Sequence, residues 1–252
     1  RHAARRGHRV SHEIVEAANV GRAFPMPAGA VVAVRDITLS IVHGEHTAIS
    51  GPSGCGKSTL LHILGCVDTP SSGTLRFDGK NVSALNDRAR SLLRLRHIGF
   101  VFQRFFLLPM LTAAENVELP QAEAGATKND RRRRSLELLE YVGLAQRADH
   151  RPSQLSGGEM QRVAIARAMA NSPAIILADE PTGNLDLTTG KEIIKLLKDM
   201  NEQSGVTVIS ATHDMKMLDV SDRVVWIRDG KIDRIEDRGD LDIDVGGIEG
   251  EE

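Results

Sequence analysis

The stretch that decides the fold is Gly51-Pro52-Ser53-Gly54-Cys55-Gly56-Lys57-Ser58-Thr59. It follows an apolar segment that ends at Ile49, and it precedes residues 57–64, which have the pattern of a helix. Glycines let the backbone curl so that successive N–H groups point inward, and a helix N-terminus adds positive potential at the same place. Lys57 supplies a mobile positive charge, and the hydroxyl of Ser58 is a suitable ligand for Mg²⁺. The order strand, glycine loop, helix therefore predicts a phosphate-binding loop rather than a tight turn with an isolated lysine.

Cys55 lies inside this loop and has two interpretations. It is either a small filler, which we favour, or a thiol whose pKa is lowered by the helix N-terminus. The chain has 2 cysteines, and the other, Cys66, follows the same predicted helix. This count predicts no disulfide framework and favours a reducing compartment.

A second motif ends the apolar segment Ile175-Ile176-Leu177-Ala178 with Asp179 and Glu180. Charges at the end of a buried strand lie at the sheet edge where ligands of α/β folds bind. We expect Asp179 to hold Mg²⁺ and Glu180 to accept a proton from an attacking water, a role worth about 10² to 10⁴-fold in rate. The alternative is an ordinary solvated strand end, and the phosphate-binding loop in the same chain favours the catalytic interpretation.

A third motif, Leu155-Ser156-Gly157-Gly158-Glu159, precedes an Ala-rich segment. Ser156 and Glu159 have the spacing of a capping box, so we predict that a helix begins here. Two glycines in a first turn cost about 1 kcal/mol each relative to Ala, and they leave N–H groups open to an anion. Because the loop at residues 51–59 already encloses one triphosphate, we expect this second site to serve the nucleotide bound to another copy of the chain.

Strands and helices alternate along the chain, which predicts an α/β fold with a mostly parallel sheet flanked by helices. Aromatic residues are only 3% of the 252 residues, so the core is aliphatic, as is typical of buried parallel strands. The predicted elements are strands at 14–18, 31–41, 45–50, 174–179 and 206–212, helices at 57–64 and 189–203, hairpins that turn at Asp78-Gly79 and Asp229-Gly230, and an amphipathic helical region at 105–144.

We divide the chain into four kinds of segment. A basic tail spans residues 1–11, and a nucleotide-binding α/β core spans 12–103 and 171–240. A helical subdomain that carries the third motif is inserted at 104–170. Residues 241–252 form an acidic tail.

Charge and hydropathy exclude two kinds of partner contact. The net charge of −2 gives no support to bulk electrostatic binding of nucleic acid. No apolar run approaches the roughly 18 to 20 residues that span a bilayer, so we expect a membrane role only through a partner. The run Arg131–Arg134, with Glu137 and Glu140 nearby, favours a solvated helix face over a contact with anionic lipid or nucleic acid.

The order of these motifs over about residues 12–238 resembles that of ABC ATPases. The resemblance implies the P-loop NTPase fold with an N-terminal antiparallel β subdomain, and it implies nucleotide contacts from residues 51–59 and from Ser156, Gly157 and Gly158. It also implies that Gln103 contacts Mg²⁺ and water and relays to a membrane partner. His213 would hold the γ-phosphate.

Two further assignments come from the same resemblance. Asp186, in the segment Asn184-Leu185-Asp186, would belong to a loop that crosses a dimer interface. Phe24 would stack on the adenine ring, at a position where family members often have Tyr.

As a function, the resemblance implies hydrolysis of ATP with Mg²⁺ by a head-to-tail dimer of two copies. The energy would drive a separate multi-span membrane permease subunit, with the chain at the cytoplasmic face of the plasma membrane. Residues 64–73 and 178–186 look like the macrolide-export and lipoprotein-release group, which also includes cell-division ATPases. Residues 105–108 are apolar and directly follow Gln103, so they are either buried in the helical subdomain or part of a groove for a short helix of that partner.

Two other functions compete with this one. The chain could be a soluble ABC-type ATPase of nucleic-acid repair or translation that is not coupled to transport. It could also be a regulatory nucleotide-binding module without hydrolysis, which the presence of Glu180 and His213 disfavours.

Overall fold

The computed structural model describes residues 12–27 and 29–241. The predicted basic tail and nearly all of the acidic tail therefore lie outside the described residues. The elements in chain order are β1 (Glu13–Met26), β2 (Gly29–Val42), β3 (His46–Ser50), α1 (Lys57–Leu64), β4 (Ser72–Phe77), β5 (Lys80–Asn81), α2 (Asp87–His97), β6 (Ile98–Phe102), α3 (Ala113–Glu123), α4 (Lys128–Tyr141), α5 (Gly157–Ala168), β7 (Ile175–Asp179), α6 (Leu187–Ser204), β8 (Thr207–Ala211), α7 (Met215–Val220), β9 (Arg223–Arg228) and β10 (Lys231–Asp237). Short 3₁₀ turns lie at Ala145–Arg147, Pro152–Gln154 and Arg238–Asp240.

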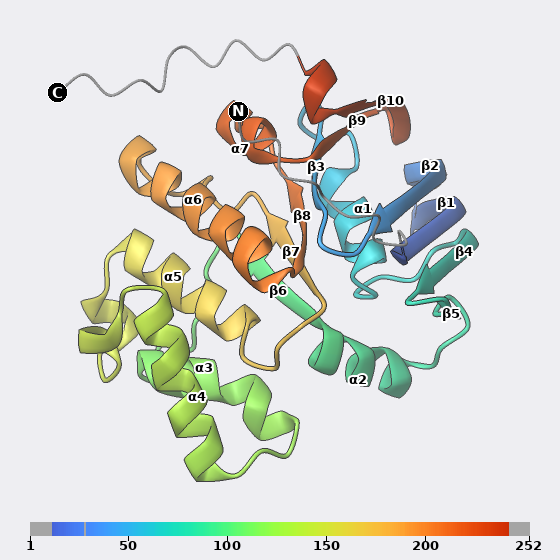
Figure 1. Ribbon diagram of the computed structural model, residues 1–252. Coiled ribbons are helices and arrows are strands. Elements are labelled where there is room, and N and C mark those ends of the chain that lie inside the picture. Colours follow the sequence, from blue (N-terminus) through green and yellow to red (C-terminus); the bar gives the residue numbers. More distant parts are fainter. Residues whose placement is uncertain (1–11, 28, 242–252) are drawn as a thin grey trace, which may run out of the picture.

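The strands form two sheets (Figure 1). The smaller has the order β2-β1-β4-β5, and its neighbours are antiparallel. The larger has the order β10-β9-β3-β8-β7-β6, in which all neighbours from β9 to β6 are parallel and only β10 is antiparallel. Helix α1 lies on the side of the larger sheet that faces the smaller one, whereas α5 and α6 cover the other side. The predicted α/β class and the antiparallel β subdomain are confirmed.

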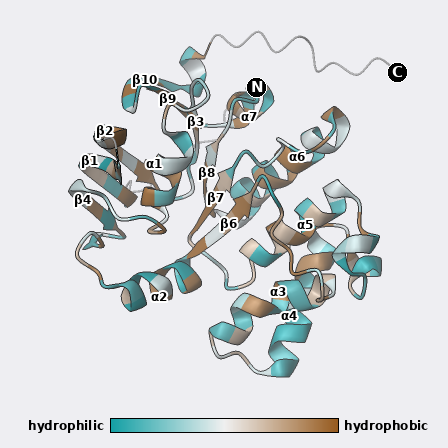
Figure 2. Ribbon diagram, turned by 180° about the vertical axis from the view of Figure 1, so that it is seen from behind, coloured by the Kyte–Doolittle hydropathy of each residue, from teal (hydrophilic) through white to brown (hydrophobic). Residues whose placement is uncertain are grey.

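Strand β7 shows why the central strands read as unbroken apolar runs. Ile175 and Leu177 belong to the core shared with α1 and the antiparallel sheet, whereas Ile176 and Ala178 belong to the core shared with α5 and α6. All four side chains are fully buried, because successive residues of a strand point to opposite faces and both faces are covered. Figure 2 shows the apolar colour along these strands and the hydrophilic colour over much of α2 and α4.

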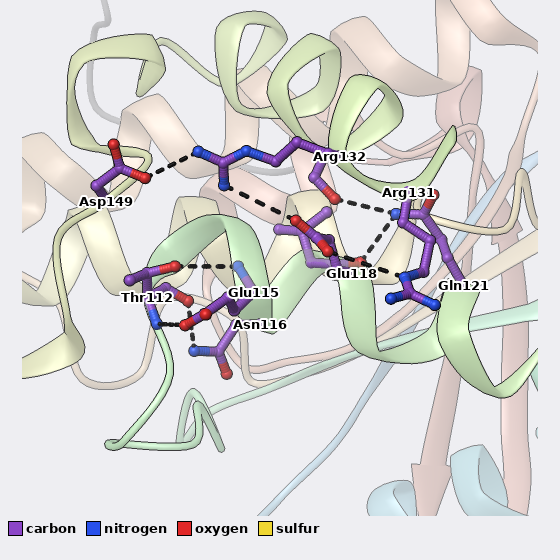
Figure 3. Close-up of polar contacts among 10 residues, drawn as sticks. Thr112, Glu115, Asn116, Glu118, Gln121, Arg131, Arg132 and Asp149 are labelled. Carbon is purple, nitrogen blue, oxygen red and sulfur yellow. Dashed lines mark hydrogen bonds and ion pairs between the residues drawn. The ribbon is translucent and has the colours of Figure 1, made fainter. Parts of the chain in front are cut away.

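Helices α3, α4 and α5 lie between β6 and β7 in the chain, as predicted for the inserted helical region, whose boundaries at 104 and 170 stay a prediction. Ion pairs join α3 to its neighbours: Glu118 lies 3.8 Å from both Arg131 and Arg132, and Arg132 also contacts Asp149 at 2.8 Å (Figure 3). The arginine run is thus a solvated face only in part, since its first two members face α3. The last two, Arg133 and Arg134, pair with acids on α4 itself, Asp130 and Glu137.

Residues 105–112 were expected to be helical and are not, since α3 begins only at Ala113. The cause is the fully buried side chain of Asn116. Its Oδ1 accepts a hydrogen bond from the backbone N–H of Leu108 at 2.8 Å, and its Nδ2 donates to the carbonyls of Leu108 and Thr112 at 3.2 and 2.9 Å. These side-chain bonds replace helical backbone bonds and give the segment an irregular path.

Helix α2 is absent from the elements predicted above. None of its residues is buried, so it carries no strong apolar periodicity. Its signal is instead at its ends, where the Asn86 side chain accepts from the N–H of Ala89 and where Asp87 lies in the first turn and Arg94 in the last, as the helix dipole favours.

The structure contains no helix, among the residues it describes, that is long and apolar enough to cross a membrane.

Substituting Asn116→Ala is expected to lower the free energy of unfolding by about 2 kcal/mol, because it removes three side-chain hydrogen bonds to Leu108 and Thr112 and leaves a space at a fully buried position. The measurement is urea unfolding followed by circular dichroism. Asn81→Ala is the matched control: Asn81 is exposed and accepts one bond from Ser83 N–H, so its loss should cost no more than about 0.5 kcal/mol. Equal costs in the two variants would contradict the role given to Asn116.

Candidate active site

A cavity of about 640 Å³ lies at the carboxyl ends of the central parallel strands. It is lined by every residue of 51–59 except Cys55, together with Ala33, Gln103, Glu180 and His213. These residues come from β2 and from the segments that follow β3, β6, β7 and β8. The structure thus gathers most of the predicted phosphate and catalytic residues, and it adds Ala33, which carries no chemical group that a motif search would find.

The loop at residues 51–59 can follow its path only with glycines at two points. Gly51 has φ 151° and Gly56 has φ 107°. A Cβ on Gly51 would lie 2.1 Å from the carbonyl oxygen of Ile227, and one on Gly56 would lie 2.5 Å from that of Ala33. Backbone from β9 and β2 therefore presses directly on the loop and fixes its shape.

Lys57 and the start of α1 form the cationic part of the cavity. The Nζ of Lys57 donates to the carbonyl oxygens of Gly51 and Pro52 at 2.8 and 3.1 Å, so the ammonium is held across the loop. Gly56 is the N-cap of α1 and supplies no capping side chain. The first N–H groups of α1 consequently have no side-chain cap and are available to an anion.

Ser58 lines the cavity and contacts Asp179 at the end of β7, although 121 residues separate the two in the sequence. The hydroxyl of Ser58 donates to Oδ1 of Asp179 at 2.9 Å. Burial raises the pKa of the Asp179 carboxyl above its usual value, and the Ser58 hydrogen bond offsets only part of this effect. The ionised carboxylate of Asp179 is poorly solvated, so a cation bound beside it would stabilise its charge.

Glu180 and His213 form the second side-chain pair. Their Oε1 and Nδ1 atoms lie 2.9 Å apart, with the Glu180 side chain only 18% exposed and the His213 side chain 76% exposed. Glu180 has φ 46°, an uncommon conformation for a residue with a side chain, and its N–H donates to the carbonyl of Ala211 at 2.8 Å. That bond to the end of β8 holds the carboxylate at the mouth of the cavity.

Gln103 is tied to the segment after β7. Its Nε2 donates to Oδ1 of Asn184 at 3.4 Å, and Nδ2 of Asn184 donates back to the Gln103 carbonyl at 2.9 Å. Fully buried Gln161 on α5 donates to the carbonyl of Pro181 at 2.8 Å. Asn184 thus joins the segments that follow β6 and β7, and Gln161 joins the second of them to α5. Gln161 is a positioning residue that its sequence pattern does not reveal.

The predicted capping box at the start of α5 is present. Glu159 N–H donates to the Ser156 hydroxyl at 3.2 Å, and Ser156 N–H donates to the Glu159 carboxylate at 2.8 Å. A Cβ on Gly158 would lie 2.3 Å from Cγ2 of Thr189, whereas one on Gly157 would meet only ordinary contacts. Close packing on α6 therefore explains why position 158 is a glycine, and no ligand is needed for that. None of Ser156, Gly157 and Gly158 lines the cavity, so their predicted contact with an anion stays a prediction.

Four other predicted ligand residues lie off the cavity lining: Asp179, whose contact with Ser58 is described above, Phe24, Asp186 and Cys55. Phe24 on β1 lies under the guanidinium of Arg22, 4.6 Å from its ring centroid. Asp186 caps α6 by accepting from the N–H groups of Thr188 and Thr189 at 3.0 Å each. Cys55 is 6% exposed, which agrees with the filler interpretation. The adenine and dimer roles of Phe24 and Asp186 stay predictions.

Comparison with known proteins identifies this arrangement. Residues 34–183 match the ABC transporter family, and the chain belongs to that family as an ATP-binding ATPase cassette. It is 51% identical over 227 residues to an uncharacterized ABC transporter ATP-binding protein of Thermotoga maritima, covering 90% of this chain and 97% of the relative. It is 49% identical to the macrolide export ATP-binding/permease protein MacB of Salmonella typhimurium, covering 87% of this chain and 34% of MacB.

A solved structure supports the same assignment. The ATP-binding cassette MJ0796 of Methanocaldococcus jannaschii, solved as a dimer in a post-hydrolysis state with ADP and Pi, superposes with a TM-score of 0.83 at 44% identity, covering 89% of this chain and 98% of that one. The predicted fold and family resemblance are thereby confirmed.

The raised pKa of Asp179 predicts a pH-dependent gain in stability on substitution Asp179→Asn. A carboxyl whose pKa rises on folding destabilises the fold at pH values above its unfolded pKa, where the unfolded chain ionises more readily. Without metal or nucleotide, the Asp179→Asn variant should therefore have a melting temperature a few degrees above that of the unsubstituted chain at pH 7. This gain should disappear as pH falls below 3.8, the ordinary value, where both states are protonated.

Differential scanning calorimetry at several pH values measures this effect. Asp36→Asn, at an exposed position, is the control and should leave the melting temperature at pH 7 unchanged. A gain that persisted undiminished into acid would show that the desolvated charge of Asp179 is not its cause.

Proposed function

We propose that two copies of this chain close head to tail around two molecules of Mg·ATP, hydrolyse them, and thereby drive a separate multi-span membrane subunit. The observation that carries the proposal is the meeting of the Ser58–Asp179 and Glu180–His213 pairs beside one phosphate-binding loop. The dimeric relative with bound ADP and Pi supports the closed pair of copies. The similarity to MacB supports a machine of the macrolide-export or lipoprotein-release kind.

The donor set fits Mg²⁺. Ser58 Oγ and Asp179 Oδ1 are adjacent hard oxygen donors, the kind that Mg²⁺ takes together with water and substrate phosphates. Gln103, the third proposed ligand, lines the same cavity as Ser58. When bound, the ion would neutralise charge on the β- and γ-phosphates.

The chain's own residues supply positioning and charge for phosphoryl transfer. The N–H groups of the loop and of the first turn of α1 bind the phosphates, and Lys57 turns from the loop carbonyls to the phosphate oxygens. Glu180 accepts a proton from the attacking water, and His213, hydrogen-bonded to it, orients the carboxylate and reaches the γ-phosphate. Such preorganised groups provide most of the acceleration in phosphoryl transfer.

The partner copy would complete each site. Ser156 is exposed, and neither it nor Asp186 lines the cavity of its own chain. Leu187, next to Asp186, is 78% exposed, which suits a surface that becomes covered in a dimer. These features support an arrangement in which the start of α5 contacts the nucleotide held by the other copy, and Phe24 contacts the adenine held by its own.

Glu180→Gln is expected to lower steady-state ATP hydrolysis by at least about 100-fold, because the general base is lost, and to accumulate an ATP-bound dimer. Phosphate release gives the rate, and size-exclusion chromatography with light scattering gives the mass. Glu202→Gln, an exposed acid at the end of α6, is the control and should behave as the unsubstituted chain. Normal turnover in Glu180→Gln would remove Glu180 from the role of base.

We place the membrane partner's contact beside Gln103. A cavity of about 350 Å³ is lined by residues of β6, α5, α2 and α3 and by Phe106, which is 61% exposed. Arg167 of α5 donates to the carbonyls of Phe105 and Phe106 at 2.9 and 2.6 Å, which fixes this segment. This hollow includes Phe102, the residue directly before Gln103. Its apolar lining suits a short helix of the membrane subunit, which would hold the chain peripherally at the cytoplasmic face of the plasma membrane.

Phe106→Glu is expected to reduce the stimulation of ATP hydrolysis by the membrane subunit by about tenfold or more, because a desolvated charge opposes docking, while the basal rate of the isolated chain stays unchanged. The assay compares turnover with and without the partner in proteoliposomes. Tyr141→Glu, at an exposed apolar position on α4, is the control. Undiminished stimulation in Phe106→Glu would place the docking surface elsewhere.

Co-purification with a membrane subunit separates transport coupling from the alternative of an uncoupled soluble ATPase. Isolation of the chain with a multi-span membrane protein from its native membrane supports coupling. Full function in nucleic-acid repair or translation without any such protein would support the alternative.

A further inference from the structure

We propose that His12, His43 and Asp78 form a surface site for a divalent transition-metal ion, of which Zn²⁺ is the expected occupant. The three residues lie at the start of β1, just after β2, and in the turn between β4 and β5. One ligand atom from each lies within 4.8 Å of the other two. The site belongs to the antiparallel sheet and shares no residue with the nucleotide cavity.

Backbone hydrogen bonds hold the three residues together. The N–H of His43 donates to the carbonyl of His12 at 3.1 Å, and the N–H of Asp78 donates to that of Ile14 at 2.8 Å. Asp78 has φ 49° in a two-residue turn with Gly79, so the turn itself directs its side chain. The positions are therefore set by the sheet before any ion binds.

The side chains are already close to a coordinating arrangement. Nε2 of His12 lies 3.0 Å from Oδ1 of Asp78, and the rings of His12 and His43 are nearly parallel with centroids 5.6 Å apart. Tetrahedral Zn²⁺ with bonds of about 2.0 to 2.1 Å requires ligand atoms about 3.3 Å apart. Rotation of exposed side chains closes the remaining gap, since His12 is 63% and Asp78 54% exposed.

The donor types select the class of ion. Two imidazoles and one carboxylate suit Zn²⁺, Cu²⁺ and Ni²⁺, whereas Mg²⁺ and Ca²⁺ prefer oxygen ligands alone. The nearby Lys80 ammonium opposes a cation and sets a limit on affinity.

Such an ion would act as a clip on the antiparallel sheet. It would join the residue before β1 to the end of β2 and to the β4–β5 turn, and so add a bond to the backbone pairing and side-chain contacts that already hold these segments together. An ion that binds only the folded chain stabilises it by mass action. The chemistry thus assigns the cluster a structural site, independent of ATP hydrolysis.

Isothermal titration of the full, untagged chain with ZnCl₂ in the presence of excess Mg²⁺ tests the proposal. We expect one Zn²⁺ per chain and a zinc-dependent rise in melting temperature. Each of His12→Gln, His43→Gln and Asp78→Asn should weaken zinc binding by more than about tenfold, because even the outer partners of metal ligands carry that much affinity. Asn tolerates the positive φ of position 78, so this variant removes charge without disturbing the turn.

Two controls locate the site. His150→Gln makes the same chemical change in the helical region, and a His2→Gln, His8→Gln double variant tests histidines that lie outside the described residues. Neither should alter zinc affinity, and basal ATP hydrolysis without zinc should be unchanged in all variants. Absence of zinc binding, retention of full affinity in the three cluster variants, or loss of binding in either control would overturn the proposal.

Discussion

Burial of β3, β7 and β8 on both faces is the constraint on which the rest of the structure depends. Strands β3 and β8 have every residue buried, and β7 has four of five. Such strands can carry charged groups only where they end, and parallel strands end at the same edge. The phosphate-binding loop follows β3, the Asp179–Glu180 pair stands at the end of β7, and His213 follows β8, so one packing requirement brings the reacting groups together.

The antiparallel sheet takes part in the same site through close backbone contacts. Gly230, in the β9–β10 turn, donates its N–H to the carbonyl of Cys55 at 3.1 Å and accepts from the N–H of Arg35 at 2.8 Å. A Cβ on Gly230 or on Gly56 would each lie within 3 Å of the Ala33 carbonyl oxygen. The loop is therefore enclosed by β2 on one side and the β9–β10 turn on the other, and its conformation is determined by tertiary contacts as much as by its own glycines.

The sequence predicted the elements whose local signal and tertiary role agree. Helix α1 begins and ends at the predicted residues 57 and 64, and both hairpins turn at the predicted Asp-Gly pairs. Sequence-based prediction of secondary structure was wrong or incomplete where side-chain contacts, or their absence, decide whether a helix can be recognised. Residues 105–112 are kept from forming a helix by the side chain of Asn116, and α2 buries no residue and so leaves no apolar pattern. In the candidate site, the glycine loop and the carboxylates follow from spacing, whereas Ala33 contributes only its backbone position and Gln161 only a buried hydrogen bond, neither of which a motif encodes.

The contacts of Lys57 with its own loop have a consequence for nucleotide exchange. Because the ammonium already has two carbonyl acceptors, an arriving phosphate replaces existing hydrogen bonds instead of meeting a bare charge. Binding strength is then a difference between two sets of acceptors, and it is smaller than the electrostatics of the lysine alone would give. The same exchange runs in reverse when product leaves, because the Lys57 ammonium can again donate hydrogen bonds to the carbonyls of Gly51 and Pro52. The lysine that binds the phosphate therefore also lowers the free-energy cost of releasing it.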